Sequence, residues 1–269
     1  MTRKNGTTGR TGTGRQDAVR SAQPRRGRRP VGPVLLFAGL AGLCLTVVAP
    51  AGASEAPAAD RGPGRGHATS AIVDSTRHDG RSVALTFDDG PNPTDTPRLL
   101  EVLREHRVKA VFCLWGEHVE QHPEVVRAIV ADGHALCNHT MRHDDISAWS
   151  PERIRADLRQ TNEAIRRAVP GSAPVRWFRA PYGSWGEHAA DVAAGMGMQP
   201  LGWRLDIADW EPPGTDELVR RLEEGITPGA VVLLHDGGGD RSQTVEAVDR
   251  VIPVFKDHGW RFDRPARRG

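Results

Sequence analysis

From residue 80 onward, short apolar runs alternate with longer segments in which apolar residues recur at helical spacing. The short runs predict strands at Ser82–Phe87, Ala110–Leu114, His134–Asn138, Val175–Arg179, Leu201–Leu205, Ala230–Leu234 and Trp260–Phe262. The longer segments predict helices at Pro97–Arg107, Pro123–Ala131, from Pro151 behind a Ser150 cap, Glu187–Met196, Asp216–Glu224 and Thr244–Lys256. This alternation predicts an α/β fold with a mainly parallel sheet and right-handed crossovers. About seven such strands can close into a barrel or stay open as a doubly wound sheet, and periodicity does not decide between them.

Residues 1–53 have a different pattern, which is typical of a secretory signal peptide. Four arginines within residues 25–29 precede an apolar run, Val34 to Ala49, and small residues around Ala53 fit a cleavage site. The alternative is an uncleaved anchor, although the run is shorter than the ~20 residues that span a bilayer. We therefore expect a signal peptide over 1–53, a linker with a short lead-in over 54–79, and one folded domain over 80–265. The protein is expected to be secreted or cell-wall associated, or membrane-anchored if the leader is retained.

The composition of the chain limits the classes of function that the protein can have. The net charge of +2 combines a leader of +8 with a body, residues 54–269, of −6. Because contact with phosphates needs a basic face on the folded part, an acidic body argues against nucleic-acid binding. An apolar content of 38% and seven tryptophans exclude disorder throughout the chain. Three cysteines are too few for a disulfide scaffold; Cys113 and Cys137, on adjacent predicted strands, fit either one disulfide or two buried thiols.

Ionisable residues follow the predicted strands at their carboxyl ends. These residues are Asp88-Asp89, His139, Arg179, Asp206 and His235-Asp236. In barrels and in open α/β sheets alike, the active site lies at the carboxyl ends of the strands. The pattern therefore predicts one polar site at this rim.

His139 and His143 have the i, i+4 spacing that places two imidazoles on one face of a helical turn, as in a two-histidine metal site. Alone this spacing is a weak signal, because the chain has eleven histidines. The adjacent Asp88 and Asp89 strengthen it, since one carboxylate and two imidazoles leave open positions on a catalytic ion. Neighbouring carboxylates on an extended segment point in different directions. One aspartate can therefore bind the ion while the other accepts a proton.

Five ordered segments resemble the motifs of polysaccharide deacetylases, the carbohydrate esterase family 4 that includes chitin and peptidoglycan N-acetylglucosamine deacetylases. The segments are Thr86–Gly90, His139–His143, Arg179–Tyr182, Asp206–Trp210 and Leu233–Asp236. The resemblance covers about residues 80–263 and implies a distorted (β/α) barrel with about seven parallel strands. It makes residues 80–265 the catalytic domain.

The resemblance also implies a role for each matching residue. Asp89, His139 and His143 would hold a divalent ion, usually zinc in this family, with cobalt or another divalent ion as alternatives. Asp88 would be the base toward metal-bound water, and His235 the acid toward the leaving amine. Arg179 would pair with Asp88, Asp206 would hydrogen-bond His235, and the Tyr182 peptide N–H would stabilise the oxyanion. Trp210 and Leu233 would line the pocket for the acetyl methyl group.

These expectations describe a monomeric, metal-dependent hydrolase that removes N-acetyl groups from N-acetylglucosamine polymers, either chitin oligomers or peptidoglycan. Its expected partner is the polysaccharide, without nucleic acid and without stable membrane association once the leader is cleaved. Three alternatives remain open at this point. They are an O-deacetylase acting on acetylated xylan, a non-haem Fe(II) oxygenase that uses the two histidines and one carboxylate, and a non-catalytic carbohydrate-binding module.

Overall fold

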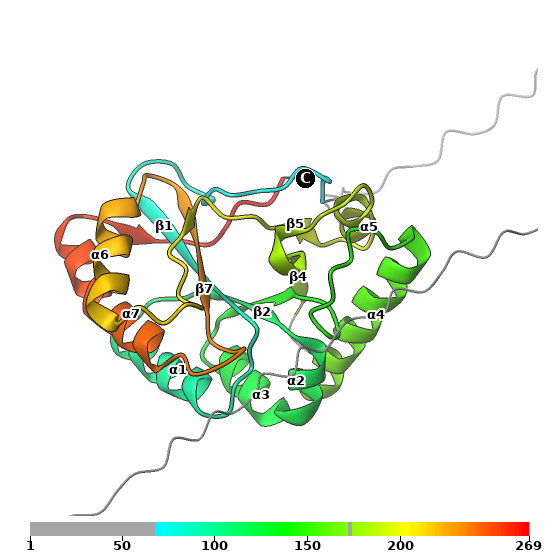
Figure 1. Cartoon of the computed structure of the whole chain (residues 1–269), viewed down its shortest axis with the longest axis horizontal. Coiled ribbons are helices and arrows are strands. Elements are labelled where there is room, and N and C mark those ends of the chain that lie inside the picture. Colours follow the sequence, from blue (N-terminus) through cyan, green and yellow to red (C-terminus); the bar gives the residue numbers. More distant parts are fainter. Residues whose placement is uncertain (1–67, 172–173, 269) are drawn as a thin grey trace, which may run out of the picture. The chain divides into compact units, whose positions relative to one another are not determined.

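The computed structural model describes residues 68–171 and 174–268. The predicted signal peptide and most of the predicted linker lie outside these residues. The described strands are β1 (Ser82–Asp88), β2 (Val111–Leu114), β3 (Ala135–Asn138), β4 (Val175–Phe178), β5 (Gln199–Pro200), β6 (Leu205–Asp206), β7 (Ala230–His235) and β8 (Arg261–Phe262) (Figure 1). The helices are α1 (Asp95–Glu105), α2 (Gly116–Gln121), α3 (Pro123–Ala131), α4 (Pro151–Ala168), α5 (Ala189–Gly195), α6 (Thr215–Gly225) and α7 (Ser242–Asp257), with a 3₁₀ turn at Pro181–Gly183. Among the described residues, no helix is both long and apolar enough to cross a bilayer.

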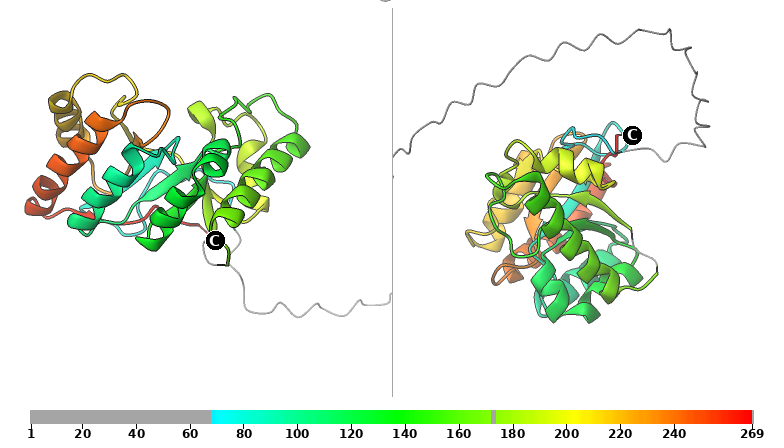
Figure 2. Two further views of the ribbon diagram at one scale, coloured as in Figure 1. Left: turned by 90° about the horizontal axis from the view of Figure 1, so that it is seen from below. Right: turned by 90° about the vertical axis from the view of Figure 1, so that its right-hand side faces the viewer.

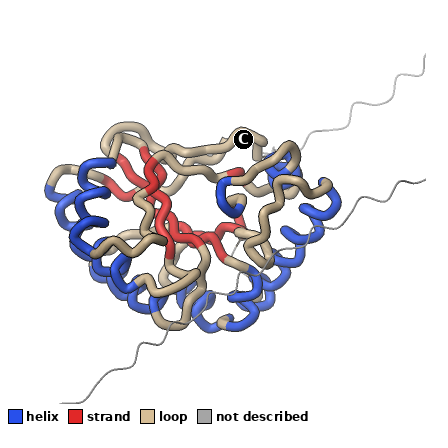
Figure 3. The backbone as a smooth tube through the Cα atoms, viewed as in Figure 1, coloured by secondary structure: helices blue, strands red, loops and turns tan. Residues whose placement is uncertain are grey.

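The strands form one curled, parallel sheet. Its order is β5-β4-β3-β2-β1-β7-β6, and β8 pairs with the start of β1. Every pairing is parallel. The path ends at β5 and β6 without pairing them, so the sheet is a half-closed barrel (Figure 3). The predicted distorted (β/α) barrel is confirmed, and the doubly wound alternative is excluded.

The helices lie on the outer side of the curled sheet (Figures 2 and 3). Strand alternation divides the side chains of β1 between two faces. Val83, Leu85 and Phe87 belong to the main core with the helices, whereas Ala84 belongs to a smaller cluster on the other face. Asp88 shares the parity of Ala84, so the end of β1 directs its carboxylate into the interior of the half-barrel.

Most predicted elements are present, including α4, whose first turn is capped by the Ser150 hydroxyl accepting from the Arg153 amide. The continuous strand predicted at Leu201–Leu205 is wrong, since the chain forms the short β5 and β6 on either side of it. Residues 68–79 contact the domain, where Val73 pairs with Leu201 and Ser75 and Thr76 form further bridges. Cys113 on β2 and Cys137 on β3 form a disulfide, which is one of the two predicted alternatives.

Candidate active site

The polar residues at the carboxyl ends of the strands surround one cleft, as predicted. The parallel register places Asp88 at the end of β1 directly beside His235 at the end of β7. The cleft has a volume of about 610 Å³. Its lining includes every predicted site residue except Arg179, which lies beneath it; the lining residues are Asp88, Asp89, His139, His143, Ala180, Tyr182, Gly183, Trp203, Asp206, Trp210, Leu233, His235, Gly238 and Arg241.

Asp88 is held by a fully buried arginine. The Arg179 guanidinium donates from Nη1 to Asp88 Oδ1 at 2.7 Å and from Nη2 to the Thr86 hydroxyl at 2.9 Å. Its remaining contacts go to the carbonyls of Leu201, at 3.2 Å, and Gly202, at 3.0 Å. A buried charge fixed by several hydrogen bonds has one orientation, so the Asp88 carboxylate is rigidly positioned. The pairing that the resemblance implied is therefore present.

Asp89, His139 and His143 place three ligand atoms together. Asp89 Oδ1 lies 3.4 Å from His139 Nε2 and 3.3 Å from His143 Nε2. This oxygen is buried and has no hydrogen-bond partner among the described residues. Burial raises the pKa of Asp89, but its interaction with His139, followed by the charges of His143 and His235, outweighs burial and lowers that pKa well below its usual range. An ionised carboxylate oxygen that faces two imidazoles suits a divalent cation. Within the described residues, Asp89, His139 and His143 are the group of side chains that could hold a metal ion.

The orientation of His139 also fits metal binding. Its Nδ1 atom lies 2.8 Å from the Arg179 carbonyl oxygen, which can only accept, so the proton resides on Nδ1. Nε2 is therefore the ring atom directed at Asp89 and the atom through which the residue could bind a cation. A backbone acceptor that orients a histidine in this way is typical of metal ligands. Arg179 thus orients Asp88 through its side chain and His139 through its backbone carbonyl.

The helical turn expected for His139–His143 is wrong, because these residues form a loop after β3. Thr140 and His143 have left-handed φ values of 67° and 56°. Side-chain hydrogen bonds replace the helical ones: Asn138 Oδ1 accepts from the Thr140 amide at 2.9 Å, and Thr140 Oγ1 accepts from the His143 amide at 3.0 Å. The histidines meet because the loop reverses, not because they share a helix face.

The residue that binds His235 is Asp209, and the predicted Asp206 contact is wrong. Asp209 Oδ1 lies 2.7 Å from His235 Nδ1, and its Oδ2 accepts from the His235 amide and the Thr244 hydroxyl, both at 2.9 Å. The side chain of Asp206 is exposed and accepts instead from the Ala208 amide at 2.8 Å. Asp206 therefore shapes the turn that brings Asp209, which is buried, under the imidazole.

The environment of His235 favours its protonated form. Burial lowers the pKa of His235, but the hydrogen bond and charge of Asp209, with smaller effects of Asp88 and Asp89, outweigh it and raise the pKa above its usual value. Sequence reasoning missed both Asp209 as the partner and Thr244 on α7. The motif offered two aspartates three residues apart, and only the backbone turn distinguishes them.

Aromatic residues form the rim of the cleft. The Tyr182 ring is 70% exposed and packs edge-on against His143, with ring centroids 4.5 Å apart. Trp210 is 42% exposed and lies edge-on to His235 at 5.4 Å. Leu233 also lines the cleft, and Trp203 is a further lining residue that sequence reasoning missed. Exposed aromatic faces beside a polar centre suit contact with sugar rings or small apolar groups.

Comparison with known proteins agrees with this geometry. The family profile described as polysaccharide deacetylase matches residues 75–201. The chain is 42% identical over 189 residues to a chitooligosaccharide deacetylase of Sinorhizobium fredii (strain NBRC 101917 / NGR234), covering 66% of this chain and 87% of the relative. The chain belongs to the polysaccharide deacetylase family.

Other members of the polysaccharide deacetylase family are similar in sequence and in structure. The chain is 37% identical to a peptidoglycan-N-acetylglucosamine deacetylase of Bacillus cereus, with 67% of this chain and 84% of the relative covered. A solved peptidoglycan N-acetylglucosamine deacetylase, in complex with an N-oxidanyl-benzamide, superposes with a TM-score of 0.67 at 34% identity, covering 71% of this chain and 89% of the other. Sequence and fold therefore give the same family assignment.

Proposed function

We propose that this protein is a metal-dependent hydrolase that removes N-acetyl groups from N-acetylglucosamine polymers. The observation that supports it most is that one cleft holds two separately oriented proton-transfer groups, Asp88 and His235, together with an Asp-His-His triad. Amide hydrolysis requires a base for the attacking water and an acid for the poor leaving group. The names of the relatives supply the substrate class: chitooligosaccharide and peptidoglycan N-acetylglucosamine.

In this proposal, Asp89, His139 and His143 hold the divalent cation, with zinc as the first candidate. When bound, such an ion supplies Lewis-acid chemistry and lowers the pKa of a coordinated water toward ~7. The chain's own residues then move the protons. Asp88, oriented by Arg179, accepts a proton as the water oxygen attacks the acetyl carbonyl.

The leaving group receives its proton from His235. The C–N bond breaks as His235, paired with Asp209, protonates the amine nitrogen, so acetate and a free amino sugar are the products. We assign the peptide N–H of Tyr182 to the developing oxyanion. Trp210 and Leu233 would enclose the acetyl methyl group.

The experiment is acetate release from N-acetylglucosamine oligomers by the full chain, measured before and after chelation and after addition of zinc or cobalt. We expect activity to disappear with chelator, to return with metal, and to fall at least 100-fold in Asp88→Asn. Asp191→Asn, an exposed aspartate on α5, is the matched control and should retain activity. Equal activity in Asp88→Asn and in the wild type would overturn the proposal.

Two further arms separate the alternatives. Faster acetate release from acetylated xylan than from chitin oligomers would identify an O-deacetylase. Activity that requires oxygen would identify an oxygenase, whereas hydrolysis proceeds equally under anaerobic conditions. We also propose that the enzyme is a monomer and, from the leader sequence, that it acts outside the cell on a wall or extracellular polysaccharide.

A further inference from the structure

A second cavity lies at the amino ends of β3 and β4, the opposite end of these strands from the catalytic residues. It has a volume of about 240 Å³, and its lining includes His134, Arg176 and Arg264. His134 immediately precedes β3, and Arg176 is the second residue of β4. None of these three residues belongs to the proposed catalytic machinery.

His134 presents a buried proton donor that has no acceptor. The residue is 7% exposed, and its Nδ1 accepts from the Ala110 amide at 3.1 Å, which places the ring proton on Nε2. Within residues 68–171 and 174–268, Nε2 has no hydrogen-bond partner. Burial, followed by the charge of Lys109, lowers the pKa of His134 to about 4, so the ring is neutral at pH 7. A buried N–H without an acceptor is unfavourable, so a ligand that supplies an acceptor at Nε2 would stabilise this arrangement.

Uncompensated positive charge surrounds this donor. Arg264 Nη2 is fixed by donating to the Gly133 carbonyl at 3.2 Å, and Lys109 Nζ donates to the Asp132 carbonyl. In the described part of the chain, no carboxylate oxygen lies within 4 Å of a side-chain nitrogen of Lys109, Arg176 or Arg264. The nearby Asp132 carboxylate is taken by Arg104 at 2.8 Å. The cavity therefore has several cationic groups and no anion to balance them.

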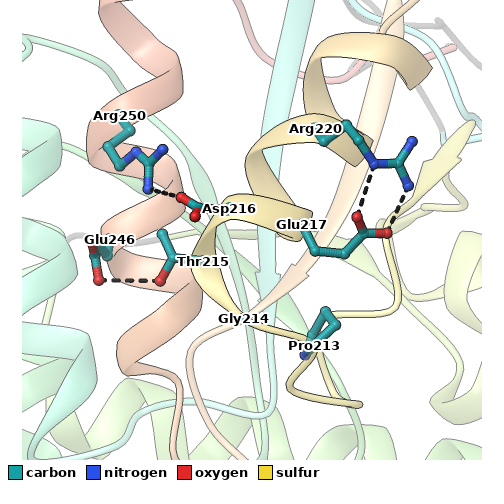
Figure 4. Close-up of a pocket in the computed structure, with 8 residues that line it drawn as sticks. All are labelled: Pro213, Gly214, Thr215, Asp216, Glu217, Arg220, Glu246 and Arg250. Atoms are coloured by element: carbon teal, nitrogen blue, oxygen red, sulfur yellow. Dashed lines mark hydrogen bonds and ion pairs between the residues drawn. The ribbon is translucent and has the colours of Figure 1, made fainter.

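A pocket between the starts of α6 and α7 shows the opposite arrangement (Figure 4). There Arg220 donates to Glu217 at 2.7 Å and Arg250 donates to Asp216 at 2.7 Å. Its arginines already have carboxylate partners, so nothing in that pocket requires an anion. The arginines of this pocket are therefore neutralised by carboxylates, whereas those of the cavity at the amino ends of β3 and β4 are not.

We propose that the cavity at the amino ends of β3 and β4 binds a phosphate group through the His134 Nε2–H donor and the Arg176 and Arg264 guanidinium groups. Guanidinium groups match the geometry of phosphate oxygens, and the imidazole N–H supplies a directional third donor. The phosphate can be free or can be a phosphodiester of an anionic polymer. A polymer bound at this end of the strands would leave the catalytic cleft at the other end open to substrate.

The test follows the His134 imidazole nitrogens of the full-length protein by NMR during titration with inorganic phosphate. Sodium chloride at matched ionic strength is the reference. Because the signal comes from His134, phosphate bound at the catalytic cleft does not register. We expect a saturable shift with phosphate, and at least a tenfold weaker affinity in Arg176→Gln/Arg264→Gln, since both lost hydrogen bonds involve charged groups. Arg220→Gln/Arg250→Gln, which removes the same charge elsewhere, should bind as the wild type does.

A second arm replaces phosphate with a poly(glycerol phosphate) chain. Tighter binding of the polymer assigns the site to phosphodiesters, and tighter binding of inorganic phosphate assigns it to the free ion. Phosphate and chloride giving the same response would overturn the proposal and leave His134 bonded to water only. An unchanged phosphate affinity in Arg176→Gln/Arg264→Gln would also overturn it. These outcomes measure binding, so they are independent of whether the protein deacetylates polysaccharides.

Discussion

Replacing Asp209 with asparagine should impair protonation of the leaving amine while leaving the Asp-His-His triad intact. The Asp209 carboxylate accepts three hydrogen bonds, from His235 Nδ1 at 2.7 Å and from the His235 amide and Thr244 hydroxyl at 2.9 Å. Asparagine keeps the shape but loses the negative charge and one acceptor. The histidine therefore loses the main interaction that raises its pKa against the effect of burial.

The magnitude follows from the lost charge-assisted hydrogen bond. Such bonds are worth ~1.5–3 kcal/mol, and ~1.4 kcal/mol corresponds to one pH unit. Because the acid must be protonated, activity declines as the pH rises through the pKa of His235. We therefore expect the alkaline decline of Asp209→Asn to begin about 1–2 pH units lower. At pH 7 we expect kcat to fall by about 100-fold, within the ~10²–10⁴ range of general acid catalysis.

The assay is kcat for acetate release from N-acetylglucosamine oligomers as a function of pH. Asp206→Asn is the matched control, because the exposed Asp206 accepts only from the Ala208 amide. It should keep the pH profile and reduce kcat less than threefold, since the asparagine amide oxygen can still accept from the Ala208 amide and maintain the turn. If Asp206→Asn moved the alkaline limb and Asp209→Asn did not, the assignment of the His235 partner would be refuted. Thermal unfolding of both variants separates loss of the acid from loss of folding.

Three further changes test other parts of the molecule. Thr244→Val removes one donor to Asp209 and should lower kcat about two- to tenfold, whereas Thr244→Ser should retain activity. Reduction of the Cys113–Cys137 disulfide, which closes a separation of 24 residues, should lower the free energy of unfolding by about 3 kcal/mol in urea titrations. Burial raises the pKa of Asp236 to about 7, so the folded protein retains a proton that the unfolded chain releases above about pH 4. Stability should therefore fall as the pH rises from about 4 to 7, and Asp236→Asn should remove most of that dependence.

Periodicity predicted the long strands and helices because these elements bury a regular apolar face. It failed at Leu201–Leu205, where the apolar pattern continues but the strand is interrupted between β5 and β6. The carbonyls of Leu201 and Gly202 accept from the Arg179 guanidinium, at 3.2 and 3.0 Å. The buried arginine that follows β4 thus takes carbonyl acceptors that a neighbouring strand would otherwise use. This competition comes from the tertiary structure, so the local sequence does not contain it.

The sequence predicted the residue types of the candidate site more fully than the hydrogen-bond partner of each residue. The positions of ionisable residues after strands indicated the rim and the triad, since parallel strands bring their ends together. The partner of His235 could not be derived in this way. Asp206 and Asp209 have the same chemistry, and the choice between them depends on Ala208, whose φ of 51° reverses the chain between the two.

Backbone reversals of this kind explain why the sequence predicts which chemical groups form the site but not how they are arranged in space. Six non-glycine residues of the described chain have a positive φ, and five lie in or beside the cleft: Asp89, Thr140, His143, Tyr182 and Ala208. Each such conformation costs ~1–3 kcal/mol unless the surroundings enforce it. Asn138, Thr140 and Asp206 enforce three of them through side-chain hydrogen bonds to the backbone. These polar residues therefore stabilise the backbone conformation of the site, and their contribution can be recognised only in the folded structure.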